Sequence, residues 1–149
     1  MTDLDYIAKR LFNKIKWQQT PEQVGADDLV EIVCDSIRRL YVISGRTFIF
    51  SENMFIYDTE DEKRKVPRYF DYDFEIDEVE WILLESQIGF YKTCQSNVDD
   101  LVSYSTDAMT VSHGDKPYKN LSETIKGLED ERNVVWTRMV RFNQLGVAG

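Results

Sequence analysis

The fold is decided by residues 77–101, which read DEVEWILLESQIGFYKTCQSNVDDL. Apolar residues recur here every three or four positions, which is the period of an amphipathic helix. One face carries Val79, Ile82, Leu83, Phe90, Cys94, Val98 and Leu101, and the first half adds Trp81, Leu84, Ile88 and Tyr91. Asp77 and Glu80 have the spacing of a capping box. We therefore predict one helix from Asp77 to about Ser103, roughly 40 Å long, whose first half is buried on more than one side.

A second long helix is predicted near the end of the chain. Its apolar positions follow spacings of 4, 3, 7, 4 and 3, with Arg132 at the skipped position: Leu121, Ile125, Leu128, Val135, Met139 and Phe142. Asn120 and Glu123 again have capping-box spacing. A seam this regular suits lengthwise packing against an antiparallel partner, most simply the helix at 77–103.

The segment between these helices, residues 105–119, lacks a helical period. Residues 108–112 favour an extended strand, and residues 113–117 are rich in turn formers. We expect a projecting loop or hairpin here, and a flexible tail at residues 146–149.

The N-terminal part predicts two shorter helices. The first spans Asp3–Trp17, and the second begins after Asp27 and stops at Gly45. Short aromatic runs at 48–50 and 54–57 flank residues 51–53, which permits a small hairpin. The expected fold is therefore mainly α: a helical bundle built on a long antiparallel helix hairpin, with a projecting loop or short β-hairpin, in a single domain spanning residues 1–149.

Charge and hydropathy exclude several classes of protein. The 149 residues carry 18 basic and 27 acidic side chains, a formal net charge of -9. Residues 48–80 hold 11 of the acids and only 4 of the bases, so most of the excess lies in one segment, either as a functional surface or as a solvated loop. Such a charge repels nucleic acid phosphates, which disfavours sequence-specific DNA binding. The sequence also contains neither a membrane-spanning run nor a secretion signal, so we expect a soluble intracellular protein.

The residues that usually carry catalysis or hold metals are sparse. The single histidine, His113, has no nucleophile context, and the seven glycines form no phosphate-binding motif. Cys34 and Cys94 lie in apolar helical patterns far apart, which predicts two buried free thiols and no zinc site. We therefore expect no enzyme activity, no metal and no cofactor.

The order of the parts is more informative than any single residue. The chain has a capped long helix after an aromatic and acidic segment, then the loop TDAMTVSHGDKPYKNL, then a final helix ending VVWTRMVRF. In this order, and in the motif from Thr106–Asp107–Ala108 to Gly114–Asp115–Lys116, the chain resembles the head-tail connector, or adaptor, proteins of tailed bacteriophages. The resemblance covers most of residues 27–143 and is strongest over 77–142.

The resemblance implies a virion protein of the neck, made in the cytoplasm of the host bacterium. Its implied partners are the portal protein, copies of itself in a ring that is usually twelve-fold, and a tail-side neck protein. DNA passes through such a ring without specific binding, and no membrane is involved. A net negative charge is compatible with this role, because each basic contact would add affinity for DNA phosphates.

Two surfaces are candidate partner interfaces. The first is the end of the last helix, where Arg138, Arg141 and Phe142 combine charge with an aromatic anchor. The same side chains are also explained if the arginines complement the helix C-terminus and Phe142 closes the core. The second is the loop at 105–118, represented by Met109, Val111, His113, Asp115 and Lys116.

Two other functions remain open at this point. An acidic protein that mimics DNA would occupy a basic groove on a host DNA-processing enzyme, through binding that salt weakens. A hydrolase would need a buried carboxylate pair in a pocket, which no pattern in the sequence requires.

Overall fold

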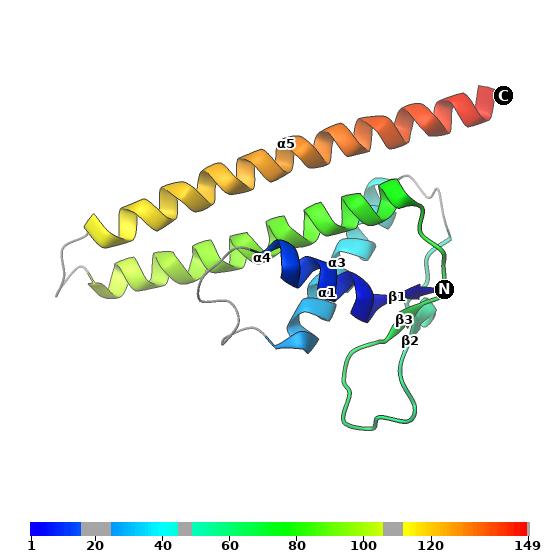
Figure 1. Ribbon diagram of the computed structural model, residues 1–149, viewed down its shortest axis with the longest axis horizontal. Coiled ribbons are helices and arrows are strands. Elements are labelled where there is room, and N and C mark those ends of the chain that lie inside the picture. Colours follow the sequence, from blue (N-terminus) through cyan, green and yellow to red (C-terminus); the bar gives the residue numbers. More distant parts are fainter. Residues whose placement is uncertain (16–24, 45–48, 106–111, 149) are drawn as a thin grey trace.

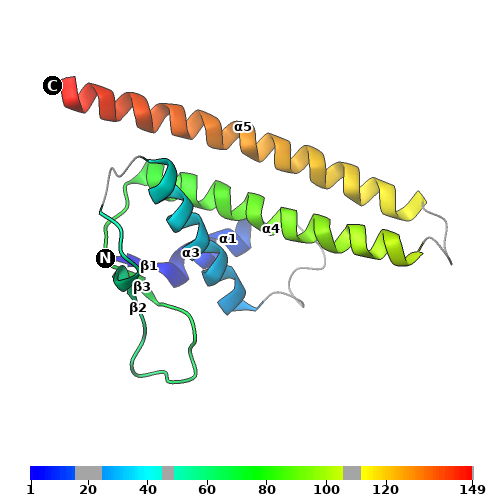
Figure 2. The same ribbon diagram turned by 180° about the vertical axis from the view of Figure 1, so that it is seen from behind.

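The computed structural model describes residues 1–15, 25–44, 49–105 and 112–148, and it describes side chains over 1–15, 25–44, 49–95 and 121–140. Figure 1 shows the arrangement of the four described helices: α1 (Leu4–Lys14), α3 (Ala26–Ile43), α4 (Ile76–Ser105) and α5 (Ser112–Ala148). The central helix is α4, with α5 along one side and α1 and α3 against the other (Figures 1 and 2). The predicted mainly α bundle on a long antiparallel hairpin is confirmed.

The hairpin is held by the predicted seam. Leu121, Ile125 and Val135 are buried, and Leu128 and Met139 pack against the core from partly buried positions. At the skipped position Arg132 donates to the Glu85 carboxylate, and near the far end the Gln95 amide donates to Ser122 Oγ at 2.9 Å. Glu85 precedes Gln95 in α4, whereas its partner Arg132 follows Ser122 in α5, so these two contacts show that the helices run antiparallel.

The start of α4 differs from the prediction by one residue, and its capping residues differ entirely. The helix begins at Ile76, and the Glu75 backbone N–H donates to Glu78 Oε1 at 2.9 Å. The residues that form the capping hydrogen bond at the start of α4 are therefore Glu75 and Glu78. Asp77 and Glu80 are not a capping box, because both carboxylates accept hydrogen bonds from Arg138 of α5.

The segment before α5 is shorter than predicted. Since α5 begins at Ser112, residues 112–119 are helical and do not form the expected loop, and Asn120 lies inside the helix instead of capping it. Turn-forming residues are weak local signals, and α4, which continues to Ser105, gives the first turns of α5 a helix to run beside (Figure 1). The helix also continues to Ala148, so residues 146–148 are not an irregular tail.

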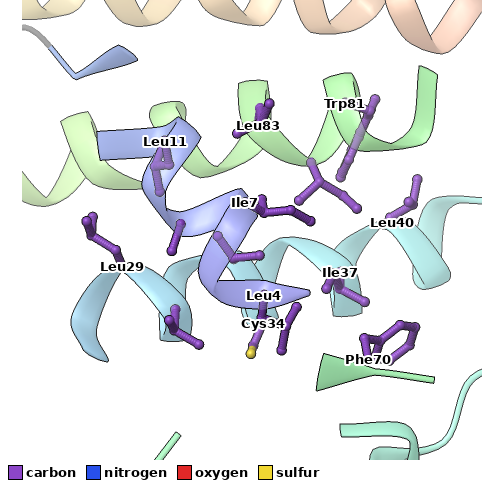
Figure 3. Packing of buried hydrophobic residues seen from close by; sticks show 14 of the residues in the cluster. Leu4, Ile7, Leu11, Leu29, Cys34, Ile37, Leu40, Phe70, Trp81 and Leu83 are labelled. Carbon is purple, nitrogen blue, oxygen red and sulfur yellow. The ribbon is translucent and has the colours of Figure 1, made fainter. Parts of the chain in front are cut away.

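The N-terminal helices form the main core with α4. Figure 3 shows Leu4, Ile7 and Leu11 of α1 facing α3 and α4, and all three are buried. Their partners are the buried residues Leu29, Val30, Val33, Cys34, Ile37 and Leu40 of α3 and Trp81, Ile82, Leu83 and Leu84 of α4. Where α3 and α4 cross, the small Ser36 and Ser86 hydroxyls hydrogen-bond at 2.9 Å. Phe12, which follows the same apolar period in α1, is instead 41% exposed.

The ends of these two helices depart slightly from the prediction. In α1 the Asp3 carboxylate accepts from the Asp5 N–H at 2.9 Å, and the helix ends at Lys14 instead of Trp17. In α3 the N-cap is Gly25, whose N–H donates to Asp28 Oδ2 at 3.2 Å, so Asp27 is not the cap. The predicted stop at Gly45 lies outside the described residues.

A small antiparallel sheet closes one end of the core. Its strands are β1 (Thr2–Asp3), β2 (Phe55–Ile56) and β3 (Tyr69–Phe70), in the order β1-β3-β2, and the short 3-10 helix η1 (Glu52–Met54) precedes β2. The expected pairing of 48–50 with 54–57 is wrong, because Phe55 pairs with Phe70 across a longer connection. Phe70 is fully buried and lies against Phe50, Phe55 and Phe74. Burying these rings together explains why the strands pair at long range.

Candidate functional site

A pocket lies where α3, α4 and α5 meet. Its volume is about 460 Å³, and it is lined by Arg39, Val42, Ile43, Trp81, Glu85, Arg132, Asn133 and Trp136. We call it the three-helix pocket. Trp81 and Trp136 supply apolar surface, and Val42 and Ile43 remain 75% and 46% exposed. The pocket therefore combines charged groups with apolar area that is still accessible to a partner.

Glu85 is the centre of this pocket. Its position on α4 directs the carboxylate toward both neighbouring helices, and it is only 5% exposed. Oε1 accepts from Arg39 Nη1 of α3 at 2.8 Å, and Oε2 accepts from Arg132 Nη1 of α5 at 2.5 Å. A buried carboxylate needs such partners, because an unpaired buried charge is strongly unfavourable. One side chain thus ties three helices together.

The contact with Glu85 leaves most hydrogen-bond donors of the two arginines without a partner among the described residues. A guanidinium carries five N–H donors, and among the described residues Arg39 and Arg132 each donate one hydrogen bond, to Glu85. The pocket holds two positive charges against one negative charge, and the Arg39 side chain is 61% exposed. This arrangement can accept a further carboxylate in the two-pronged geometry that arginine favours.

Arg38, the neighbour of Arg39 in the sequence, makes more hydrogen bonds than Arg39 does. Its guanidinium donates to both Glu52 carboxylate oxygens, at 2.8 and 3.0 Å, and to Asp35 at 2.8 Å, and it also lies 4.9 Å from the Phe55 ring centre. These hydrogen bonds lower the pKa of Glu52. Arg38 is thus committed to holding η1 against α3, whereas Arg39 keeps donors for another group.

A second charged feature is the connection between β2 and β3, residues 57–68, which we call the β2–β3 loop; it carries four acidic and four basic side chains. It projects away from the sheet on the side opposite α5 (Figures 1 and 2). At its base, Arg64 donates to both oxygens of Asp5, at 2.6 and 3.0 Å, and to the carbonyls of Val66 and Pro67. The hydrogen bonds with Asp5 raise the pKa of Arg64 and fix the base of the loop to α1.

The outer part of the β2–β3 loop is less constrained. Asp58 accepts from the Glu60 backbone N–H at 3.0 Å and from Arg68 at 2.9 Å, which together lower its pKa. Glu60 and Glu62 are exposed, and within the described part of the chain their carboxylates form neither an ion pair nor a hydrogen bond. The exposed Lys63 and Lys65 follow directly, so the outer part of the loop presents charges of both signs from a fixed base.

Of the predicted interface residues, Arg138 has described contacts. Its guanidinium donates to Asp77 at 3.1 Å and to Glu80 at 2.7 Å, so it fastens α5 to the start of α4. Arg141 and Phe142 follow it in α5, and His113, Asp115 and Lys116 lie at the start of that helix. The side chains of these five residues are outside the described set, and Met109 and Val111 lie wholly outside the described residues.

The three-helix pocket was not predicted as a site. Its one sequence signal is Arg132 at the skipped position of an apolar seam, which indicates a buried or half-buried partner of opposite charge. Glu85 follows the apolar run Trp81–Leu84, where a charged residue also stands out. Only the packing of α3 beside α4 adds Arg39 to them.

The described residues contain no cluster of ligands suited to a metal ion. The thiols Cys34 and Cys94 are both free, as predicted, although Cys94 is only half-buried. Burial raises the pKa of Cys34 to about 12 and also raises the pKa of Cys94, so neither thiol is activated as a nucleophile.

Comparison with known proteins adds no relative. No family model matches the chain, and searches of curated proteins and of solved structures found no match either. Within the described residues, none of the helices combines the length and apolarity needed to cross a membrane.

Proposed function

We propose that this protein is a structural component of a tailed-phage neck, forming a ring that binds the portal after DNA packaging and joins head to tail. The observation that carries the proposal is a subunit that bears two dissimilar surfaces: the three-helix pocket, which α5 helps to line, and the β2–β3 loop, which projects on the side opposite α5 (Figures 1 and 2). A ring closes through side-to-side contacts between two different faces of each subunit, and this subunit offers two such faces.

The site chemistry supports a binding role. The three-helix pocket holds arginines that bond a carboxylate, and within the described residues it contains neither a histidine nor a cysteine. Its single carboxylate, Glu85, is held by two arginines and lacks the second acid that a hydrolase pair would need. We infer a structural protein that lets DNA pass without binding it specifically.

Ion pairing within the chain reduces the number of acids available for DNA mimicry. Four acids of the segment at 48–80 already have arginine partners within the chain: Glu52, Asp58, Asp77 and Glu80. A protein that imitates the phosphate backbone must leave its acids free for the basic groove of its target. The paired carboxylates are therefore poorly suited to that task.

Quantitative mass spectrometry of purified phage particles tests the proposal. We expect this chain in near-equal copies with the portal protein, enriched in DNA-filled heads and retained through purification. If the chain is made in infected cells but absent from particles, the neck assignment is wrong. Tight, salt-sensitive capture of a basic DNA-processing enzyme would then establish the acidic inhibitor instead.

The portal contact is assigned to the end of α5. The double substitution Arg141→Ala and Phe142→Ala is expected to leave helicity intact and to reduce attachment of the chain to portal-bearing heads. Arg138→Ala is the comparison variant, because it breaks the ion pairs with Asp77 and Glu80 that fasten the hairpin. Normal assembly and infection by particles carrying the double substitution would refute the docking assignment.

A further inference from the structure

We propose that the three-helix pocket binds a segment of a partner protein that presents one carboxylate beside an apolar side chain. In this contact the carboxylate accepts hydrogen bonds from Arg39 and Arg132, and the apolar side chain packs against Val42 and Ile43. The inference goes beyond the proposed neck function, because it names the chemistry of what enters this pocket and does not depend on the assembly in which the chain works.

The charge of the pocket selects a single carboxylate. Among the lining residues, Arg39 and Arg132 carry two positive charges, and Glu85 balances one of them. Each guanidinium has five N–H donors and donates one hydrogen bond among the described residues, to Glu85. One further carboxylate balances the remaining charge and fits the fork of an arginine. A phosphate group carries a charge of about -1.5 to -2, which would leave excess negative charge beside the Glu85 carboxylate.

The positive groups of the pocket are also its accessible groups. The Arg39 side chain is 61% exposed and that of Arg132 is 24% exposed, whereas the Glu85 side chain is 6% exposed. Attraction by the two guanidiniums is therefore available to a partner, while the carboxylate that would repel it is enclosed.

Apolar surface lies beside these donors. Val42 and Ile43, in the last turn of α3, are 75% and 46% exposed, and Trp81 and Trp136 line the same pocket from α4 and α5. Covering such side chains removes apolar area from water, which favours binding. The occupant must therefore carry an apolar group next to its carboxylate.

The occupant is a segment of a protein chain, because the pocket is too open to hold a free small molecule. Sites for small molecules enclose about 70–90% of the surface of the ligand. Here Arg39 and Val42 remain mostly exposed, so the pocket is open on the side of α3. A peptide that crosses this open side can place one carboxylate among the arginines, as in other cases where arginines recognise acidic motifs.

Binding of short peptides to the purified full-length chain tests the proposal, followed by NMR through the indole N–H signals of Trp81 and Trp136. The probe is the tripeptide leucine-glutamate-phenylalanine, acetylated and amidated so that the glutamate carboxylate is its only charge. A second peptide has glutamine in place of glutamate, and a third has phosphoserine there. A fourth keeps the glutamate but has alanine on both sides of it.

Asn133 provides a matched pair of variants. It lines the pocket and is exposed, so Asn133→Glu adds negative charge there, whereas Asn133→Gln adds a side chain of the same shape without charge. Arg39→Ala removes the more exposed guanidinium and leaves Glu85 paired with Arg132. Circular dichroism of each variant checks that its helices are retained.

We expect the glutamate peptide to shift both indole signals with a Kd of about 1 mM, and to bind about tenfold more tightly than the other three peptides. Arg39→Ala and Asn133→Glu should each weaken this binding by about tenfold, whereas Asn133→Gln should leave it almost unchanged. In Asn133→Glu the glutamine peptide should bind at least as tightly as the glutamate peptide, because the added charge repels only the latter. Raising salt from about 0.1 M to about 1 M should weaken binding of the glutamate peptide alone.

Several results would overturn the proposal. Absence of any indole shift, equal binding of the glutamate and glutamine peptides, or equal effects of Asn133→Glu and Asn133→Gln would each show that the pocket does not recognise a carboxylate. Tighter binding of the phosphoserine peptide would assign the pocket to phosphate, and loss of peptide binding through self-association would assign it to a second copy of the chain. Mass spectrometry of particles is independent of all these results, so it separates failure of the pocket assignment from failure of the neck assignment.

Discussion

At the scale of single residues, Glu85 is the side chain on which the arrangement of α3, α4 and α5 most depends. Removing the Glu85 carboxylate leaves Arg39 and Arg132 without their acidic partner. Breaking a buried ion pair in this way typically lowers the free energy of unfolding by about 3–5 kcal/mol. Because Arg39 is 61% exposed and can turn to water, we expect Glu85→Ala to lower the free energy of unfolding by about 3 kcal/mol, the low end of that range.

Arg39→Ala is the matched comparison for Glu85→Ala. It leaves Glu85 paired with Arg132, so the loss should be at most about 1 kcal/mol, as for exposed ion pairs. Urea unfolding followed by circular dichroism measures both values. Equal losses for the two variants would show that Glu85 is not the shared partner of the three helices.

Glu78 gives the fold a dependence on pH. It is 9% exposed, and its pKa is raised mainly because burial disfavours the charged carboxylate. The hydrogen bond from the Glu75 N–H lowers the pKa, but its effect is smaller than that of burial. A carboxyl whose pKa is higher in the folded than in the unfolded state makes folding take up a proton. Stability is therefore lost as pH rises from the unfolded value of 4.5 through the folded pKa.

Replacing Glu78 with glutamine tests this dependence. Glu78→Gln keeps an oxygen that accepts from Glu75 but stays neutral at every pH. We expect it to be more stable than the wild-type chain at pH 7, with the difference shrinking toward zero as pH falls below 4.5. Chemical denaturation at several pH values measures the difference, with the exposed Glu31→Gln as control. A difference that does not change with pH would rule out titration of Glu78 as its source.

At the scale of secondary-structure elements, α5 contains a glycine whose replacement should stabilise the helix. Gly127 lies in the middle of the helix, and a β-carbon built at this position meets nothing within 4 Å. Glycine in a helix interior is less favourable than alanine by about 0.5–1 kcal/mol, because it loses more backbone freedom on folding. We expect Gly127→Ala to raise the free energy of unfolding by that amount, measured by urea denaturation. No gain would indicate that α5 is not helical at this position before the chain unfolds.

The elements also show what a sequence pattern can predict. The stripes of α1, α3 and α4 and the seam of α5 were predictable because burial repeats with the helix period over many residues. Helix ends were less predictable, because one hydrogen bond decides them: Asp77 and Glu80 have capping-box spacing, but Arg138 takes both carboxylates. The two-residue strands left no periodic signal, and their partners are chosen by the burial of Phe70.

The three-helix pocket was predictable only in part, because a sequence pattern reports on one helix and not on the contacts between helices. Arg132 interrupts the seam, and that signal is local to one helix. The pairing of Arg39 with Glu85 joins positions 46 residues apart and depends on how α3 crosses α4, which a single sequence does not encode in any period. Similarly, the acid content of 48–80 was visible, but which acids keep their charge free depends on the arginines that the fold brings to Glu52, Asp58, Asp77 and Glu80.

At the scale of the whole molecule, the hairpin has a supported half and a projecting half. The first half of α4 is enclosed by α1, α3 and α5, whereas its last turns run beside α5 away from the other helices (Figures 1 and 2). A smaller cluster, which includes Tyr91, Leu121 and Ile125, lies where this projecting half begins, and Ile15 and Ile32 pack against it. Regions with fewer buried contacts open at lower free energy than the core does.

Hydrogen exchange should reveal these two halves. In the wild-type chain we expect the slowest amides between Trp81 and Tyr91 and faster exchange beyond residue 95. Leu121→Ala removes buried volume from the smaller cluster, at a cost of about 2–3 kcal/mol, and should speed exchange in the last turns of α4 and the first turns of α5 alone. Val135→Ala, in the main cluster, should speed exchange in α1 and α3 as well.

Uniform acceleration by Leu121→Ala would mean that the hairpin opens only with the whole domain. The expected local opening has a functional consequence, because the three-helix pocket and the β2–β3 loop both belong to the supported half. Their relative placement then stays fixed while the projecting end of the hairpin adjusts. In the proposed neck ring, the supported half would keep its shape while the projecting end fits a partner above or below it.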